Sequence, residues 1–326
     1  MVKLRDMVRP ARPLYRSAMR TTARRAVGHL LALASCAGCL GLHGCASGPS
    51  PQPTRIPFRL TQADNISVRA RVNGTEPVNL LHHTAMDSVS LTRVATARMA
   101  RFEATESATV RSWGGTTTAR HSTGNTLQIG DLVYRDVAIT EDEQTGPGTD
   151  GKFGPNLFAG KIVEVDYDAE QIVLHDALPK LDERWHAVPL TVRDGLPCID
   201  CEIVVGDRTL TQSFLLHSGF HGTALLDTEF VAANALDGAL ATIRESVLHD
   251  SYGNEVKTRV VQVPALRLGP ITMRDVPVGV FEGKVGSRRT SLLGANALKR
   301  CNFVLDTANG RLWVRPSRFV DAPFAK

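Results

Sequence analysis

Residues 81–91 read LHHTAMDSVSL, and residues 215–225 read LLHSGFHGTAL. In each stretch, apolar residues lead into a His, then a hydroxyl residue, a small residue and a return to apolar residues. His83 and His217 are 134 positions apart. A strand that ends in a tight polar loop with a small residue holds a side chain at a fixed point. We therefore expect the chain to be organised around these two loops.

The two halves of the chain share further short blocks in the same order. FGPNLF at residues 153–158 corresponds to LGANAL at residues 293–298, a separation of 140 positions. Asp166 and Asp306 follow these blocks at the same separation. Matched blocks in one order indicate an internal duplication.

From Ile56 on, short runs of Val, Ile, Leu and Thr alternate with Gly, Asn and Asp. Such runs predict strands joined by tight turns. Helical patterns are confined mainly to residues 91–99 and 228–240. We expect an all-β fold with two lobes, residues 56–178 and 187–316, joined by a polar linker.

The two loops resemble the active-site loops of aspartic peptidases, in which an apolar pair precedes Asp, then Thr or Ser, then Gly. With the other matched blocks, the resemblance covers nearly all of the chain beyond its N-terminal segment. It implies a two-lobed acid-protease-like barrel fold, either pepsin-like or a tandem of retropepsin-like units. His83 and His217 would then occupy the two positions of the catalytic Asp residues, with Thr84, Ser218 and Gly219 in supporting roles.

The replacement of both Asp residues by His changes the chemistry that the resemblance implies. Aspartic peptidases activate a water between two carboxylates that share one proton. Imidazoles are bulkier, titrate near neutrality, and offer one donor and one acceptor when neutral. The first loop also has Ala85 where the second keeps Gly219. We predict a protein without ordinary aspartic peptidase activity, whose interlobe cleft binds an extended peptide or another polymer.

Two alternatives remain open at the level of sequence. An active peptidase or other hydrolase would use the pair His83 and His217 as acid and base. A metal-binding protein would add His221, because two or three His side chains at one point form a zinc shell in outline. The chain has no metal motif of fixed spacing, and we expect no cofactor.

Each half contains a candidate hairpin between its His loop and its closing block. The first spans residues 110–118 with Trp113 at its tip, and the second spans 247–258 with Tyr252 at its tip. Glycine-rich tips suit tight hairpin turns. In aspartic peptidases the first hairpin is a flap over the cleft, so the resemblance implies that both aromatic residues contact a bound segment. Two surface hairpins with one aromatic residue each are the alternative.

The first 44 residues read as a targeting segment. They contain eight Lys or Arg residues and one acidic residue, with a short apolar run at 26–42. This run is too short and interrupted for a stable membrane span, and its order is typical of a secretory signal. It leads into LHGC, which resembles a bacterial lipobox and implies lipidation of Cys45. Ala46 is not the Asp used for inner-membrane retention, which implies the periplasmic face of the outer membrane.

The net charge of +5 comes largely from this segment. Taking its eight basic and one acidic residues from totals of 38 and 33 leaves 30 and 32, a net charge of −2. Nothing basic enough for nucleic acid remains. Residues 45–55, rich in Ser, Pro and Gly, read as a flexible tether between the lipid and the first lobe. The sequence predicts no oligomeric state.

Cys198 and Cys201 form a CxxC pattern within a predicted strand. Three residues along an extended strand span roughly 10 Å, which is too far for a disulfide. Pairing of one of them with Cys301 is the alternative, and we expect a structural role for all three.

Overall fold

The computed structural model describes residues 52–324 apart from 101, 105, 113–114 and 283–289. The predicted signal segment, Cys45 and Trp113 lie outside the described residues. Within those residues, no helix has the length and apolar character needed to cross a membrane.

The N-terminal half is built from short strands and single-turn helices. Its elements are β1 (Thr54–Leu60), β2 (Ile66–Val72), β3 (Val78–His82), β4 (Val89–Thr92), α1 (Arg93–Thr96), β5 (Glu106–Ser112), β6 (Gly115–Ile129), β7 (Leu132–Asp142), β8 (Gly151–Phe153), the 3-10 helix η1 (Pro155–Phe158), β9 (Ile162–Asp166) and β10 (Gln171–His175). Pairing in the order β2-β3-β8-β4-β7-β6 returns to β2, so six strands close into a barrel. The β3–β8 and β4–β7 pairs are parallel.

The C-terminal half repeats this arrangement. Its elements are β11 (His186–Arg193), β12 (Leu196–Val205), β13 (Arg208–His217), β14 (Ala224–Leu226), α2 (Thr228–Ala233), β15 (Thr242–His249), β16 (Glu255–Leu268), β17 (Ile271–Phe281), β18 (Ser291–Gly294), α3 (Ala295–Leu298), β19 (Cys301–Asp306) and β20 (Arg311–Pro316). The ring β12-β13-β18-β14-β17-β16 closes on β12, with the β13–β18 and β14–β17 pairs parallel. The prediction of an all-β, two-lobed fold from an internal duplication is confirmed.

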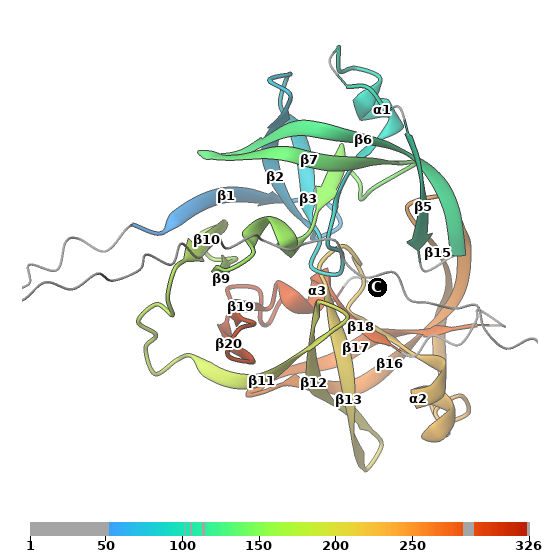
Figure 1. The fold of residues 1–326 in the computed structure, drawn as a ribbon. Helices are drawn as coiled ribbons and strands as arrows, with labels where there is room; N and C mark the ends of the chain where they lie inside the picture. Colours follow the sequence, from blue (N-terminus) through green and yellow to red (C-terminus); the bar gives the residue numbers. More distant parts are fainter. Residues whose placement is uncertain (1–51, 101, 105, 113–114, 283–289, 325–326) are drawn as a thin grey trace, which may run out of the picture. The chain divides into compact units, whose positions relative to one another are not determined.

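A third sheet joins the two barrels. Its order is β1-β10-β9-β19-β20-β11, and every pair is antiparallel. Each half contributes three strands, and the halves meet where β9 pairs with β19. Figure 1 shows this sheet along one side, with one barrel above and the other below.

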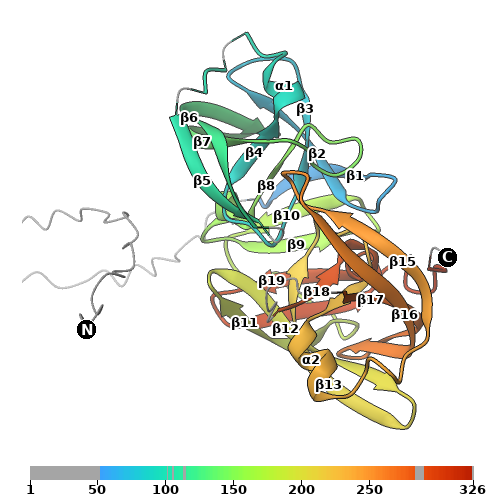
Figure 2. The same ribbon diagram turned by 90° about the vertical axis from the view of Figure 1, so that its right-hand side faces the viewer.

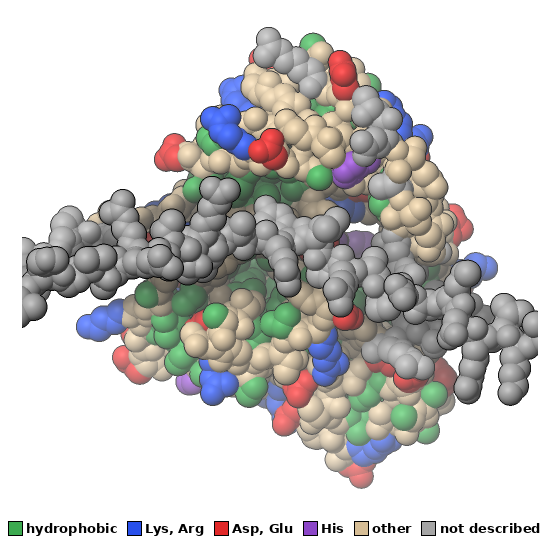
Figure 3. Space-filling model, in the orientation of Figure 1, with side chains coloured by type: hydrophobic (Ala, Val, Ile, Leu, Met, Phe, Trp, Pro, Cys, Tyr) green, Lys and Arg blue, Asp and Glu red, His purple; other side chains and the backbone are tan. Residues whose placement is uncertain are grey.

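The barrel interiors follow the alternation of apolar residues along the strands. In β2, Ile66, Val68, Ala70 and Val72 are buried, whereas Arg69 and Arg71 are exposed. This period of two directs one side of each strand into the core. Acidic and basic side chains are interspersed over the visible surface of both lobes (Figure 3).

Both predicted helices are shorter than expected. In the first, residues 91 and 92 belong to β4, and the Thr92 side chain caps α1 by accepting from the N–H of Ala95. The second begins at its Asp227 cap but ends at Ala233, and the chain then turns through Ala235 with φ of 53°. In each case a tight turn ends the helix, although the apolar periodicity of the sequence continues for several more residues.

The three described cysteines are buried and unpaired. Cys198 and Cys201 both lie on β12, where the extended backbone separates them. Burial raises the pKa of the Cys301 thiol to about 12. In this structure the two thiols do not pair with each other, and neither pairs with Cys301.

Candidate functional site

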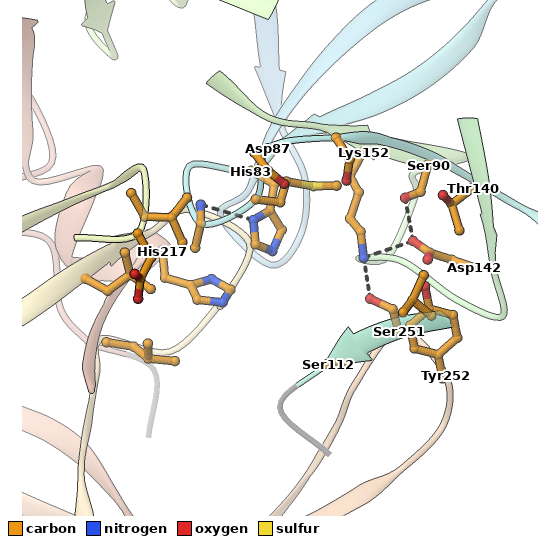
Figure 4. A pocket seen from close by; sticks show the side chains of 18 of the residues that line it. His83, Asp87, Ser90, Ser112, Thr140, Asp142, Lys152, His217, Ser251 and Tyr252 are labelled. Atoms are coloured by element: carbon orange, nitrogen blue, oxygen red, sulfur yellow. Dashed lines mark hydrogen bonds and ion pairs between the residues drawn. The ribbon is translucent and has the colours of Figure 1, made fainter. Parts of the chain in front are cut away.

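The two His loops meet between the lobes. His83 follows β3 and His217 ends β13, so each ring is held at the end of a barrel strand. The ring centroids are 4.6 Å apart and the ring planes are inclined by 58°. Both rings line a cleft of about 890 Å³ (Figure 4).

The residues after each His lock the loops together through a reciprocal exchange of hydrogen bonds. The Thr84 N–H donates to Ser218 Oγ at 2.9 Å, and the Ser218 N–H donates to Thr84 Oγ1 at 3.0 Å. Each hydroxyl then donates across the lobes at 2.6 Å, Thr84 to the carbonyl of Leu216 and Ser218 to the carbonyl of His82. Every one of these groups is buried, so the exchange fixes the position of both His backbones.

A glycine in each closing block lets the chain pass very close to the backbone of the His loop in the same half. A Cβ on Gly154 would lie 2.2 Å from the carbonyl oxygen of Met86. A Cβ on Gly294 would lie 2.1 Å from the carbonyl oxygen of Gly222. Only glycine fits at such an approach. The repeated glycine of the sequence blocks therefore has the same packing role in both halves.

One ring nitrogen of each His is turned toward its own loop. The Ala85 N–H donates to His83 Nδ1 at 3.2 Å, and the Phe220 N–H donates to His217 Nδ1 at 3.0 Å. A backbone N–H can only donate, so Nδ1 must accept. In the neutral ring the proton therefore sits on Nε2.

The surroundings of His83 oppose its protonation. Burial lowers the pKa of His83 well below 6.5, and the neighbouring His217 and the Lys152 ammonium lower it further. A proton on Nδ1 would also face the Ala85 N–H. The His83 imidazole is therefore neutral at neutral pH.

Gly219 has a more specific role than the sequence indicates. A Cβ at this position would lie 2.2 Å from Cδ2 and 2.4 Å from Nε2 of His83. The ring of the first loop thus packs directly on the backbone of the second. Sequence reasoning placed Gly219 in a supporting role but did not foresee that it makes room for an imidazole.

A polar cluster missed by sequence reasoning lies across the cleft from the two His residues (Figure 4). Asp142 at the end of β7 is 2% exposed and accepts from Ser90 Oγ at 2.5 Å. Lys152 Nζ lies 2.9 Å from the same carboxylate and also donates to Ser251 Oγ. Burial raises the pKa of Tyr252, and the charge of Asp142 and its hydrogen bond with the hydroxyl raise it further. The only sequence signal was a charged residue, Lys152, directly before the closing block at 153–158.

The tip of the second hairpin is docked onto the N-terminal lobe. The N–H groups of Glu143 and Gln144 donate to the Ser251 carbonyl at 3.0 and 3.1 Å. Gln144 Nε2 donates to the Asp250 carbonyl at 2.8 Å. The end of β15 reaches the N-terminal strands in both ribbon views (Figures 1 and 2). This hairpin therefore spans the cleft, and Tyr252 lines it.

The other His candidates lie elsewhere. His221 lines a separate cavity of about 110 Å³ beside Arg244, so it does not join the pair in the cleft. Within residues 52–324, gaps excepted, no group of three or more His, Cys, Asp or Glu side chains is arranged to hold a metal ion. His82 points away from the cleft, between Phe153 and Phe158.

Comparisons with known proteins agree with this geometry. A sequence family described as aspartyl protease matches residues 201–297, within the C-terminal half. Among solved structures, the aspartic proteinase from Irpex lacteus matches with a TM-score of 0.54 and 16% identity, over 83% of this chain and 99% of that chain. No curated protein matches. At this identity the likeness establishes an aspartic-proteinase-like fold, and activity has to be argued from the site.

Proposed function

We propose that this chain is a lipid-anchored protein of the cell envelope whose interlobe cleft binds an extended peptide or similar polymer without cleaving it as an aspartic peptidase would. The observation that carries the proposal is the pair His83 and His217, 4.6 Å apart, at the meeting point of the two loops. Their Nδ1 atoms both accept backbone hydrogen bonds.

The chemistry of the pair argues against aspartic peptidase activity. That mechanism needs one ionised and one protonated carboxyl on either side of a water. Asp87, Asp142 and Asp194 do line the cleft, but none of them replaces a His of the pair. Asp142 is already engaged by Ser90 and Lys152.

A hydrolase based on the two imidazoles is also disfavoured. A general base needs a lone pair directed at the proton that it removes. In each neutral ring the only lone pair is on Nδ1, where a backbone N–H already occupies it. To act as a base at Nε2, a ring would have to shift its proton to Nδ1 and lose that hydrogen bond.

The shape and lining of the cleft support an extended, polar ligand. The cleft runs between the lobes and is lined by parts of both hairpins, including Ser112 and Tyr252. Hydroxyl groups of Ser88, Thr140 and Thr290 supply further polar contacts. A polymer segment bound in such a cleft makes repeated main-chain hydrogen bonds along its length.

Digestion of a peptide library tests the absence of cleavage. We expect no specific products from the purified protein at any pH from acid to neutral. Specific cleavage that disappears in both His83→Ala and His217→Ala, and persists in the control His221→Ala, would establish a His-based hydrolase instead. The double variant His83→Asp with His217→Asp tests the converse, since the hydroxyl exchange of Thr84 and Ser218 should still hold two carboxyl groups together.

Binding of the same library, measured without digestion, tests the positive half of the proposal. We expect longer peptides to bind more tightly than shorter ones, and Trp113→Ala to weaken binding in line with an aromatic residue on the first hairpin. Equal affinity for a dipeptide and a decapeptide would contradict an extended ligand.

The proposal of a lipid anchor rests on the order of the N-terminal segment, in which basic residues precede an apolar run and then LHGC. Multiple acyl chains anchor a protein firmly, whereas one chain binds a membrane only marginally. Cys45→Ser should release the protein from the outer membrane or block its processing. Unchanged fractionation together with an unchanged mature mass would rule out lipidation at Cys45.

A further inference from the structure

We propose that a second cavity, separate from the cleft, binds a small carboxylate with a short apolar tail. This cavity has a volume of about 110 Å³ and is lined by residues of the second His loop and of the hairpin formed by β15 and β16. No described residue lines both the cavity and the cleft. The inference therefore goes beyond the proposed function and can fail without affecting it.

Strand alternation directs one face of this hairpin into the cavity. Arg244, Ser246 and Leu248 occupy alternate positions of β15, and all three line the cavity. Across the strand pair, Val260 lies opposite Arg244 and Thr258 lies opposite Ser246, and both of these residues line the cavity too. Residues directly opposite in an antiparallel pair share one face of the sheet. The side chain of Arg244 is therefore on the cavity side of β15.

The wall formed by the second His loop is apolar and rigid. Phe220 is buried, and a Cβ on Gly222 or Gly294 would lie 2.3 or 2.7 Å from atoms of its ring. This close packing fixes the ring, and Leu225 and Phe324 extend the apolar lining. An engineered cavity of about 150 Å³ with an apolar lining binds benzene, so a cavity of this size takes an apolar tail of about four carbon atoms.

Arg244 and His221 supply the polar end of the site. Both residues line the cavity and reach solvent. Within the described part of the chain, no carboxylate lies within ion-pair distance of either one. Asp64, the acid that acts on His221, is itself paired with Lys299 at 2.7 Å.

The two cationic groups also oppose each other. Burial lowers the pKa of His221, the charge of Arg244 lowers it further, and Asp64 raises it. An anion bound beside both side chains would relieve this repulsion. Arg holds a carboxylate through two parallel hydrogen bonds, and this geometry matches a carboxylate better than a neutral group.

A buried hydroxyl offers a further contact. Thr223 is 4% exposed and lines the cavity, and its hydroxyl has no hydrogen-bond partner among the residues that the structure describes. Most buried polar side chains in proteins have a partner. An oxygen atom of a ligand in the cavity would supply one. The cations, the hydroxyl and the apolar wall together select an acid with a short apolar tail.

Calorimetric titration of the purified protein with valerate tests the site. Valeramide has the same tail without the charge, and acetate has the charge without the tail. We expect each to bind at least about tenfold more weakly than valerate, because charge-assisted hydrogen bonds and three buried methylene groups each contribute about that much.

A fourth probe, N-acetylvaline, presents an apolar side chain and a carboxylate as they occur at the end of a peptide. Tighter binding of valerate would identify a free acid as the ligand, and tighter binding of N-acetylvaline would identify a peptide terminus. Either result supports the site.

Variants assign the binding to the cavity. Arg244→Gln should weaken binding of the tighter acid about tenfold, and Arg244→Lys should recover part of the loss. Thr223→Val keeps the shape of the side chain without its hydroxyl and should weaken binding about threefold or more. Arg274→Gln is the matched control, because Arg274 is an exposed arginine of β17 that does not line the cavity.

NMR of the protein with labelled histidine gives the position of the ligand. The acid should shift the ring signals of His221 and raise its pKa, because a nearby carboxylate favours the imidazolium. The ring signals of His83, in the cleft, should not change.

Equal affinity for valerate and valeramide would overturn the carboxylate site. Equal affinity in Arg244→Gln and the unaltered protein would do the same, as would the absence of binding by either acid. A shift of His83 without a shift of His221 would place the acid in the cleft instead. None of these results bears on peptide binding in the cleft, which is measured with the peptide library and depends on other residues.

Discussion

The loop at His83 and the loop at His217 have the same pattern of residue types but different immediate surroundings. His82 precedes the first His and is buried between two phenylalanines, whereas Leu216 precedes the second and is an ordinary core residue. The first loop continues with Ala85, and the second continues with Gly219, which receives the ring of His83. The hydroxyl exchange is symmetrical, but the packing of the rings is not. The duplicated halves therefore share the lock between the lobes and differ in how each His is accommodated.

The largest loss of stability should come from changes to the hydroxyl groups of Thr84 and Ser218, which the two halves share. Thr84→Val and Ser218→Ala each leave a buried N–H and a buried carbonyl without a hydroxyl partner. Each unsatisfied group costs about 1–3 kcal/mol, so we expect about 4 kcal/mol from either variant in urea unfolding. If the two variants differ greatly in cost, the symmetry described for the exchange is wrong.

The second-largest effect is a loss of stability at low pH that is caused by His82. Burial lowers the pKa of His82 to about 4, and both its ring nitrogens lack partners among the described residues. Because the unfolded chain takes up a proton near pH 6.5 and the folded chain only near 4, stability is lost as the pH falls through that window. The shift corresponds to about 3 kcal/mol.

His82→Leu should remove that share of the acid loss and should stabilise the protein by about 1–2 kcal/mol at neutral pH. Leu216→His is the matched change in the other half and should introduce a similar acid loss. Some acid sensitivity should persist in His82→Leu, because the pKa of His83 is also lowered by burial. An unchanged pH profile of thermal unfolding in His82→Leu would contradict the assignment.

A smaller difference in stability should distinguish substitutions at Gly219 from substitutions at Ala85. Gly219→Ala places a Cβ about 2 Å from the His83 ring and should cost about 1–3 kcal/mol as overpacking. Ala85→Gly should cost less than 1 kcal/mol, the usual penalty of added backbone freedom. Combining Gly219→Ala with His83→Ala should remove most of the cost. Additive costs in that double-mutant cycle would show that the ring and the glycine are not in contact.

The smallest effect concerns the hairpins. Tyr252→Phe removes one hydrogen bond to Asp142, which retains Ser90 and Lys152 as partners. We expect a loss of about 1 kcal/mol and faster hydrogen exchange at the Glu143 and Gln144 amides. The control Thr290→Ala, elsewhere in the lining of the cleft, should leave these two amides protected. Equal exchange in both variants would indicate that docking does not depend on Tyr252.

The fold could be predicted from the sequence because its signals are local and occur twice. The closing glycines and the apolar alternation are readable from short stretches, and the duplication supplies an internal check. The hydroxyls of Thr84 and Ser218 also follow from the pattern. By contrast, the direction of each imidazole depends on which backbone N–H comes within reach of Nδ1, and this is a tertiary property.

The polar cluster is a clearer example of tertiary contacts that short stretches of sequence do not reveal. Asp142 ends β7 and Lys152 lies on β8, the two strands that flank β4, but Ser251 comes from the hairpin of the other half. Nothing in the spacing of these residues connects them. A reading that assigns each hairpin to its own lobe as a free flap misses the contact that holds the second hairpin across the cleft.

The sheet that joins the lobes has a consequence for how the chain reaches its native state. Thr54 in β1 pairs with Leu174 in β10, and Val165 in β9 pairs with Phe303 in β19, across separations of 120 and 138 residues. Long-range pairings of this kind slow folding, since long loops must close before the contacts form. Until β19 has been synthesised, the edge of β9 that it covers has no partner and is open to pairing with other chains. The C-terminal strand β19 therefore covers an edge that is exposed earlier in synthesis. Truncations that remove β19 should aggregate more readily than their small loss of mass suggests.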